Sequence, residues 1–235
     1  MNKTINKQTE RAIVLLSGGM DSLVTAAIAN RDCQELFFMH ANYGQLTEKR
    51  ELLSFNELCK HFKPKQSRIL NWDWFAQIGG SALTDPSIEL PSSAEQEGIP
   101  ITYVPFRNAN LLAAAVSWAE VLHAEAIYIG AVEEDSSGYP DCREVFFRDF
   151  EKLIQTGTCN EFPIHIETPV LHLSKAEIVK LGMELGAPFA LAWSCYQDND
   201  VACGVCASCR LRLKAFAQAG YKDPIPYRIR QATDE

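Results

Sequence analysis

The chain has 235 residues, of which 47% are hydrophobic and 22% are charged, and its formal net charge is −8. This length and composition suit one folded domain with a sizeable core, or one large domain with a small appendage, and they argue against a disordered chain or a multi-domain array. The negative charge disfavours a surface that neutralises a nucleic-acid backbone, so we expect a small-molecule substrate and no nucleic-acid partner.

Two further features bear on where the protein works. Residues 1–10 are polar and lack the apolar core of a signal peptide, and no later run approaches the roughly 18 apolar residues of a membrane span. Half of the eight cysteines fall in one short cluster, which favours a metal site over disulfides. We therefore expect a cytoplasmic protein without a membrane partner.

The first predicted elements form a βαβ unit, with a strand at residues 12–16, a helix at 21–30 and a second buried strand at 35–41. Near-continuous apolar strands separated by helices predict an α/β fold, a Rossmann-like doubly wound parallel sheet that binds ligands at the carboxyl ends of its strands. Further strands are expected at residues 67–70, 126–130 and 164–169. Further helices are expected at residues 47–62, 109–123, from after Arg143 to about 156, 174–186 and 210–219. Thr47 is the expected cap of the first of these helices, and a capping box opens the helix at 174–186.

Residues 71–100 separate two of these elements. They are rich in Gly, Ser, Pro and acidic residues, and the stretch is too long for an ordinary connection in a compact domain. We expect it to form a functional lid or a partly ordered excursion.

A glycine turn, Ser17-Gly18-Gly19-Met20-Asp21-Ser22, joins the first strand to the first helix. Two adjacent glycines let the backbone N–H groups approach an anion, and the positive end of the helix faces the same place. Ser17 and Ser22 add hydroxyl donors, and Asp21 either caps the helix or meets a magnesium ion shared with the phosphates. The turn matches neither the common phosphate-loop pattern, G-x-x-x-x-G-K-[ST], nor the dinucleotide-binding pattern, G-x-G-x-x-G. It predicts nucleotide binding, and a glycine turn without chemistry is the alternative.

Two later segments suggest a pocket for a heterocycle. Arg107 offers a guanidinium fork for a phosphate or carboxylate, and Asn108 caps a helix or reads a base edge. Taken alone, this pair fits a helix cap with a solvated charge better than a binding site. The loop at 135–141 adds acceptors for a purine-like N–H face and an aromatic ring, Tyr139, for stacking. Cys142 follows in the same loop, but we do not expect covalent catalysis because no histidine neighbours it in sequence.

The cysteine cluster comprises Cys195, Cys203, Cys206 and Cys209. Its spacing, C-x7-C-x2-C-x2-C, lets four thiolates converge at about 2.3 Å on one tetrahedral Zn²⁺. Two disulfides or an iron–sulfur cluster are the alternatives. Because sulfur would fill all four positions, the zinc, one per chain, is expected to be structural. We expect residues 1–192 to form an ATP-binding domain, and residues 193–235 to form a zinc knuckle and a helix packed on it.

These motifs together resemble known proteins. Ser17 to Ser22 resembles the S-G-G-x-D-S loop of the pyrophosphatase-loop ATPases, which split ATP between the α- and β-phosphates and adenylate a substrate. With residues 104–108, 135–143 and 174–177 and the four cysteines, the order and spacing resemble the QueC family over nearly the whole chain. Two departures are Phe106, where many members have glycine, and Ser194, where many have threonine.

The resemblance implies an adenine-nucleotide α-hydrolase-like fold of the HUP type and an ATP-dependent ligase that acts in queuosine biosynthesis. Its substrates would be ATP, ammonia and 7-carboxy-7-deazaguanine. Its product would be 7-cyano-7-deazaguanine, formed by way of an adenylate and an amide. The enzyme would be a homodimer. The resemblance implies catalytic roles for Asp21, Ser22, Arg107 and Lys175. It implies that ATP binds with Mg²⁺ at Leu16, Ser17, Gly18, Gly19, Met20, Asp21, Ser22, Leu23, Met39, His40 and Ala41. It implies that the deazaguanine binds at Arg107, Asn108, Asp135, Ser136, Ser137, Gly138, Tyr139 and Asp141.

Three other functions remain open from the sequence. A QueC-like enzyme could join a deazaguanine carboxyl to a protein amine and keep every motif. A tRNA-modifying relative would share the ATP loop but should carry a basic RNA-binding face, which a net charge of −8 does not indicate. A non-enzymatic sensor with a zinc knuckle would bind ATP without releasing pyrophosphate.

Overall fold

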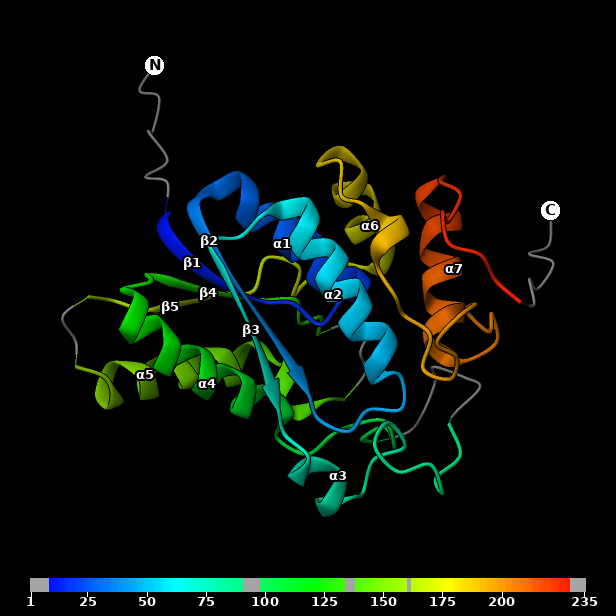
Figure 1. Cartoon of the computed structure of the whole chain (residues 1–235), viewed down its shortest axis with the longest axis horizontal. Helices are drawn as coiled ribbons and strands as arrows, with labels where there is room; N and C mark the ends of the chain where they lie inside the picture. The colour runs from blue at the N-terminus through cyan, green and yellow to red at the C-terminus, as the bar shows by residue number, and fades with distance from the viewer. Residues whose placement is uncertain (1–8, 91–97, 134–137, 160–161, 229–235) are drawn as a thin grey trace.

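The computed structural model describes residues 9–90, 98–133, 138–159 and 162–228 (Figure 1). Nearly all of the predicted helices and strands are present, with ends shifted by a few residues. The strands are β1 (Thr9–Leu15), β2 (Cys33–Asn42), β3 (Gln66–Asn71), β4 (Ala126–Ile129) and β5 (His165–Glu167). The helices are α1 (Met20–Asp32), α2 (Glu48–Phe62), α3 (Trp74–Ile78), α4 (Arg107–Leu122), α5 (Glu144–Gly157), α6 (Lys175–Glu184) and α7 (Ala207–Ala219).

The five strands form one parallel sheet in the order β3-β2-β1-β4-β5. Leu15 at the end of β1 pairs with Met39 on one side and with Ile129 on the other. The strand order reverses between β1 and β4, and in doubly wound sheets a ligand crevice forms at that switch point. The predicted Rossmann-like fold is confirmed, and the loop after β1 lies at the crevice.

Side-chain alternation along β1 explains why helices cover both faces of the sheet. Ala12 and Val14 belong to a core shared with α1, α2, α6 and α7, whereas Ile13 and Leu15 belong to a core shared with α4 and α5. Successive strand residues point to opposite faces, so a strand with both faces buried is apolar throughout. Figure 1 shows α1, α2 and α6 on one side of the sheet and α4 and α5 on the other.

The two predicted helix caps have different outcomes. Ser174 accepts a hydrogen bond from the Glu177 N–H, and the Glu177 carboxylate accepts one from the Ser174 N–H, so the capping box of α6 is confirmed. Thr47 occupies the N-cap position of α2, but its hydroxyl does not cap the helix. It donates to the Glu51 carboxylate instead, at 2.8 Å, because that half-buried acceptor competes for it.

The stretch at 71–100 contains a short helix that was not predicted. Phe75 of α3 packs with Tyr43, Leu83 and Val104 in a small separate core. Five residues are too few to show a helical period in the sequence. Residues 91–97 lie outside the described part of the chain, and a lid function for this stretch stays a prediction, as does the domain boundary at 192.

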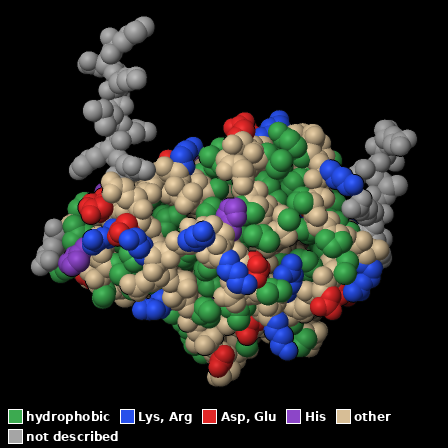
Figure 2. All heavy atoms as spheres, turned by 45° about the horizontal axis from the view of Figure 1, so that its top comes forward, with side chains coloured by type: hydrophobic (Ala, Val, Ile, Leu, Met, Phe, Trp, Pro, Cys, Tyr) green, Lys and Arg blue, Asp and Glu red, His purple; other side chains and the backbone are tan. Residues whose placement is uncertain are grey.

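Figure 2 shows basic and acidic side chains interspersed on one face. Within the described ranges, none of the helices combines the length and the apolar character that crossing a membrane requires.

Candidate active site

The loop between β1 and α1 is shaped by its first glycine. Gly18 has φ +91°, and a Cβ at this position would lie 2.9 Å from the backbone oxygen of Glu51 on α2, so glycine is required. Gly19 is the N-cap of α1. The Ser17 and Ser22 hydroxyls lie 3.0 Å apart at the mouth of the turn. The first turn of α1 presents backbone N–H groups and the positive end of its dipole, which suits a phosphate.

A second glycine brings the neighbouring strand against this loop. A Cβ on Gly130, directly after β4, would lie 2.7 Å from the backbone nitrogen of Ser22 and 2.8 Å from the carbonyl carbon of Asp21. Those atoms belong to the backbone and cannot rotate away. The end of β4 therefore fixes the position of the first turn of α1.

Gly130→Ala is expected to weaken ATP binding by at least about tenfold, because the new methyl group displaces the N–H groups that would hold phosphate. The measurement is calorimetric titration of ATP into the protein. Gly157→Ala is the matched control, since a Cβ on Gly157 would meet no atom within 4 Å. Equal dissociation constants for the two variants would contradict this description of the loop.

Asp21 and Lys175 come together from opposite parts of the chain. Lys175 Nζ, at the start of α6, lies 2.8 Å from Asp21 Oδ2, and the two side chains are 14% and 28% exposed. The other oxygen, Oδ1, is buried and has no hydrogen-bond partner among the described residues. Of the two roles predicted for Asp21, that of helix cap is wrong, because Gly19 is the N-cap. A buried carboxylate oxygen without a donor fits the kind of ligand that Mg²⁺ binds.

Many of the residues predicted to bind ATP or substrate, or to act in catalysis, line one cavity of about 320 Å³. Four of the predicted residues that the structure describes do not line it: Gly18, Leu23, Gly138 and Asp141. Three more lie outside the described part of the chain: Asp135, Ser136 and Ser137. The predicted residues on its wall are Leu16, Ser17, Gly19, Met20, Asp21, Ser22, Met39, His40, Ala41, Arg107, Asn108, Tyr139 and Lys175.

His40 is part of the wall but is held by structural contacts. Its Nδ1 lies 3.0 Å from the carbonyl oxygen of Leu16, and its Nε2 lies 3.1 Å from Oδ1 of Asn42. Burial lowers the pKa of His40. The imidazole therefore ties the end of β2 to the ATP loop.

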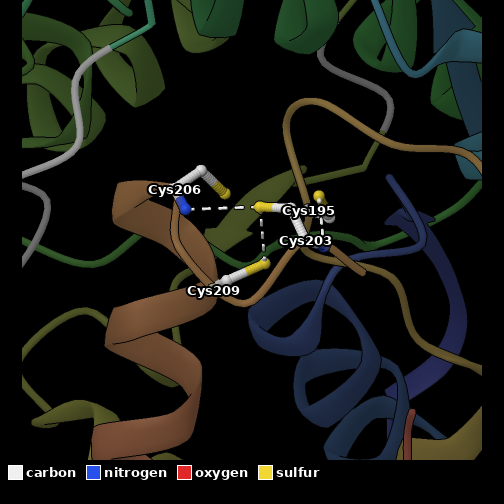
Figure 3. A group of neighbouring side chains, drawn as sticks. All are labelled: Cys195, Cys203, Cys206 and Cys209. Atoms are coloured by element: carbon white, nitrogen blue, oxygen red, sulfur yellow. Dashed lines mark hydrogen bonds between the residues drawn. The ribbon is translucent and has the colours of Figure 1, made fainter. Parts of the chain in front are cut away.

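The four predicted metal ligands converge. Cys195, Cys203, Cys206 and Cys209 are all buried, and their sulfur atoms lie within 4.8 Å of one another (Figure 3). Backbone N–H groups point at two of the sulfurs: those of Gln197, Asp198 and Cys203 approach Cys195 Sγ at 3.4–3.5 Å, and those of Val205 and Cys206 approach Cys203 Sγ at 3.3–3.4 Å. Such donors stabilise thiolates, so the arrangement can hold a metal ion.

A comparison with known protein families identifies the family of this chain. A family model described as "Queuosine biosynthesis protein QueC" matches residues 11–220. The chain belongs to the QueC family. Among similar curated proteins, the 7-cyano-7-deazaguanine synthase of Chlorobium chlorochromatii (strain CaD3) is 56% identical over 221 residues, which cover 94% of this chain and 97% of that protein. That of Acidobacterium capsulatum is 57% identical over 223 residues, which cover 93% and 96%.

The solved structures that match this chain are more distant. The U34-tRNA thiolase NcsA from Methanococcus maripaludis has a TM-score of 0.48 and 14% identity, with 80% of this chain and 61% of that chain covered. The NH3-dependent NAD synthetase from Campylobacter jejuni has a TM-score of 0.44 and 18% identity, with 79% and 68% covered.

Phe106, one of the two departures from the family pattern expected from the sequence, has an unusual backbone. Phe106 has φ +58°, in the left-handed region that favours glycine, and its side chain is 59% exposed. Its ring meets Phe146 of α5 edge to face, with centroids 6.4 Å apart. This contact compensates in part for the backbone strain.

Arg107 reaches the cavity from the first turn of α4. Its Nη1 donates to the Tyr43 hydroxyl at 2.9 Å, and its guanidinium lies 5.2 Å from the centre of that ring. Burial raises the pKa of Tyr43 to about 12, so the phenol keeps its proton. Tyr139 stands on the same wall, with its hydroxyl 2.6 Å from Thr102 Oγ1.

Asn108 and Asp141, both predicted to bind substrate, have structural partners. The Asp141 carboxylate accepts the backbone N–H of Asn108 at 2.9 Å, and the Asn108 amide donates to the Asp141 carbonyl at 3.0 Å. These bonds tie the 140–142 turn to the start of α4, and contact of either side chain with the substrate stays a prediction.

Burial raises the pKa of the neighbouring Cys142 to about 11, which disfavours a nucleophilic thiolate.

Two contributions to the site were missed by sequence reasoning. Glu51 of α2 lines the cavity, although it reads as an ordinary polar residue of an amphipathic helix. Trp193 donates its backbone N–H to the Gly18 carbonyl at 2.8 Å and so connects the cysteine segment to the ATP loop. Glu51 follows the loop at the carboxyl end of β2, and that position was the available signal that it could face a ligand. No local signal in the sequence indicates the Trp193 contact.

Proposed function

We propose that this chain converts 7-carboxy-7-deazaguanine and ammonia to 7-cyano-7-deazaguanine at the expense of ATP, as part of queuosine biosynthesis. The carboxylate is activated as an acyl adenylate, ammonia displaces AMP to give an amide, and further ATP-driven dehydration gives the nitrile. The observation that carries the proposal is the identity of 56% over 94% of the chain to a curated synthase of this name. The reaction class fits a strand-loop-helix phosphate site with a pocket beside it.

The loop at residues 17–22 is proposed to hold the phosphates of ATP. The N–H groups of the first turn of α1 and the hydroxyls of Ser17 and Ser22 would stabilise the charge that develops on pyrophosphate as the α–β bond breaks. Asp21 Oδ1 would bind the Mg²⁺ that accompanies ATP, and bound Mg²⁺ would neutralise phosphate charge. The ends of β1 and β2, at Leu16 and 39–41, would contact the adenine.

Arg107 and Lys175 are proposed to act on the anionic partners of the reaction. Both cationic side chains line the cavity with the ATP loop. Arg107 would orient the substrate carboxylate, and Lys175, which lies beside Asp21, would neutralise phosphate. Tyr139, together with the 135–138 segment, is proposed to bind the deazaguanine ring.

The cysteine cluster is proposed to bind one structural Zn²⁺. Four buried sulfurs within 4.8 Å of one another, with N–H donors around them, fit a closed tetrahedral site. Four thiolates are a complete ligand set for a structural zinc and for an iron–sulfur cluster alike, so metal analysis and the absorption spectrum of the purified protein test the choice of zinc. The enzyme is further proposed to be cytoplasmic, and to be a homodimer; the homodimer comes from the family resemblance alone.

The test is to incubate the protein with 7-carboxy-7-deazaguanine, ATP, Mg²⁺ and ammonium, and to search for the amide and the nitrile by mass spectrometry. Both products are expected, together with AMP. Activation without product from ammonium, but with product from a protein amine, would point to a protein-modifying enzyme. ATP binding without AMP release under any condition would leave a nucleotide-binding sensor.

A further inference from the structure

The cavity contains a carboxylate that the proposed reaction does not yet use. Glu51, in the first turn of α2, lies on the same wall as Asp21, Arg107 and Lys175. Its Oε1 accepts the Thr47 hydroxyl at 2.8 Å, and its Oε2 accepts the Gln45 side-chain amide at 3.2 Å. Thr47 and Gln45 are themselves buried. The Glu51 carboxylate is therefore held in one orientation.

Glu51 differs from the other cavity carboxylate in the charge of its partners. Asp21 is paired with the ammonium group of Lys175, whereas both donors to Glu51 are neutral. Within the described residues, no Lys or Arg nitrogen lies within 4.0 Å of its carboxylate oxygens. Each of those oxygens keeps a second lone pair. A recessed carboxylate with unused acceptor capacity and no ion pair suits a small cation that carries N–H donors.

The backbone of Glu51 places it beside the chemistry. A Cβ on Gly18 would lie 2.9 Å from the Glu51 carbonyl oxygen, so the first turn of α2 packs directly on the ATP loop. In the proposed reaction, pyrophosphate leaves from that loop and the acyl adenylate forms next to it. The attacking nitrogen must arrive at the same place.

We infer that Glu51 binds ammonium in this cavity and takes a proton from it when the amide forms. This inference rests on the proposed function. One N–H bond of ammonium breaks, and its proton moves to the Glu51 carboxylate. The freed lone pair of ammonia forms the C–N bond to the acyl carbon, the bond from that carbon to the phosphate oxygen breaks, and AMP leaves with the electron pair. The nitrogen then loses a second proton to the departing phosphate, which gives the neutral amide.

The electrostatic setting supports this role. Burial raises the pKa of Glu51, while the hydrogen bonds from Thr47 and Gln45 and the charge of Arg107 lower it, with an upward net shift. A carboxylate with a raised pKa is a stronger proton acceptor, and general-base catalysis is most effective when the pKa of the base approaches the working pH.

The test separates adenylation from amide formation in the Glu51→Gln variant. Exchange of labelled pyrophosphate into ATP, dependent on 7-carboxy-7-deazaguanine, reports adenylation and is expected to keep its wild-type rate and its KM for the carboxylate. Ammonium-dependent amide formation is expected to fall on the order of 10²–10⁴-fold, with a raised KM for ammonium. Glu57→Gln on the outer part of the same helix, where Glu57 pairs with Lys60, is the control and should change neither rate.

Hydroxylamine gives a second readout, because a structural defect would slow hydroxamate formation and amide formation alike. It is largely uncharged at neutral pH and needs no prior loss of a proton, so Glu51→Gln should form the hydroxamate at close to the wild-type rate. Should Glu51→Gln fail to fold in a thermal melt, Glu51→Asp keeps the charge, and the same pattern of retained exchange and slowed ammonium use is expected.

Three results would overturn the inference. An unchanged amide rate with ammonium would remove Glu51 from the step. Equal slowing with ammonium and hydroxylamine would exclude proton transfer from ammonium as its role. Lost exchange, or a raised KM for the carboxylate substrate, would show that Glu51 reads the N–H edge of the deazaguanine instead. Absence of exchange in the wild-type protein would refute the proposed function itself, and the inference with it.

Discussion

An Asp21→Asn variant is expected to lose on the order of 10²–10³-fold in turnover while it keeps its fold. Asparagine has the shape of aspartate but not its charge. It would therefore pair weakly with Lys175 and bind Mg²⁺ poorly through the oxygen that is now buried without a partner. The carboxylate-dependent exchange of pyrophosphate into ATP measures the loss directly.

The same variant should still unfold in one cooperative thermal transition, because the asparagine side chain keeps the shape of aspartate and its amide oxygen can still accept a hydrogen bond from Lys175. Asp32→Asn at the other end of α1 is the matched control, since Asp32 pairs with Arg31 far from the loop and its side chain is 39% exposed. Full activity of Asp21→Asn would refute the assignment of this loop to ATP phosphates.

A Cys206→Ser variant is expected to bind less zinc and to lose at least about 3 kcal/mol of stability, because structural zinc binding contributes directly to folding. For a chain of this size, that loss lowers Tm on the order of 10 °C. Metal content and a thermal melt check both points. ATP affinity should also fall, since the knuckle continues into Trp193, whose N–H bonds the Gly18 carbonyl.

Cys159→Ser is the control for this experiment, because Cys159 is an exposed cysteine outside the cluster. It should match the wild type in zinc content, Tm and ATP affinity. Unchanged zinc content and Tm in Cys206→Ser would show that the four cysteines are not a structural metal site.

Features with a local signature could be predicted from the sequence. The run of apolar residues in β1, the paired glycines and the apolar helix after them define the ATP loop without knowledge of the rest of the chain. The capping box at Ser174 and Glu177 is likewise contained within four residues. The cysteine spacing alone was enough to predict that the sulfurs converge.

Features that depend on distant parts of the chain could not be predicted. The Asp141 carboxylate accepts the backbone N–H of Asn108 in the first turn of α4, a contact across 33 residues of sequence, whereas the sequence suggested only a substrate acceptor for this residue. Arg212 reads as a surface charge of the last helix, yet it is 1% exposed and donates two bonds to the buried Asp223 carboxylate. Glu51 falls among the polar residues of an amphipathic helix, and only the approach of α2 to Gly18 turns it toward the cavity.

The proposed synthase activity is tested most directly with isotopes in both reactants. The protein is supplied with ¹⁵N-ammonium, Mg²⁺, ATP and 7-carboxy-7-deazaguanine whose carboxylate oxygens carry ¹⁸O, and the products are read by mass spectrometry. We predict a nitrile that contains ¹⁵N and AMP that contains ¹⁸O transferred from the carboxylate. Release of ADP instead of AMP, or AMP without ¹⁸O, would contradict an acyl adenylate, and absence of the labelled nitrile would contradict the proposed function.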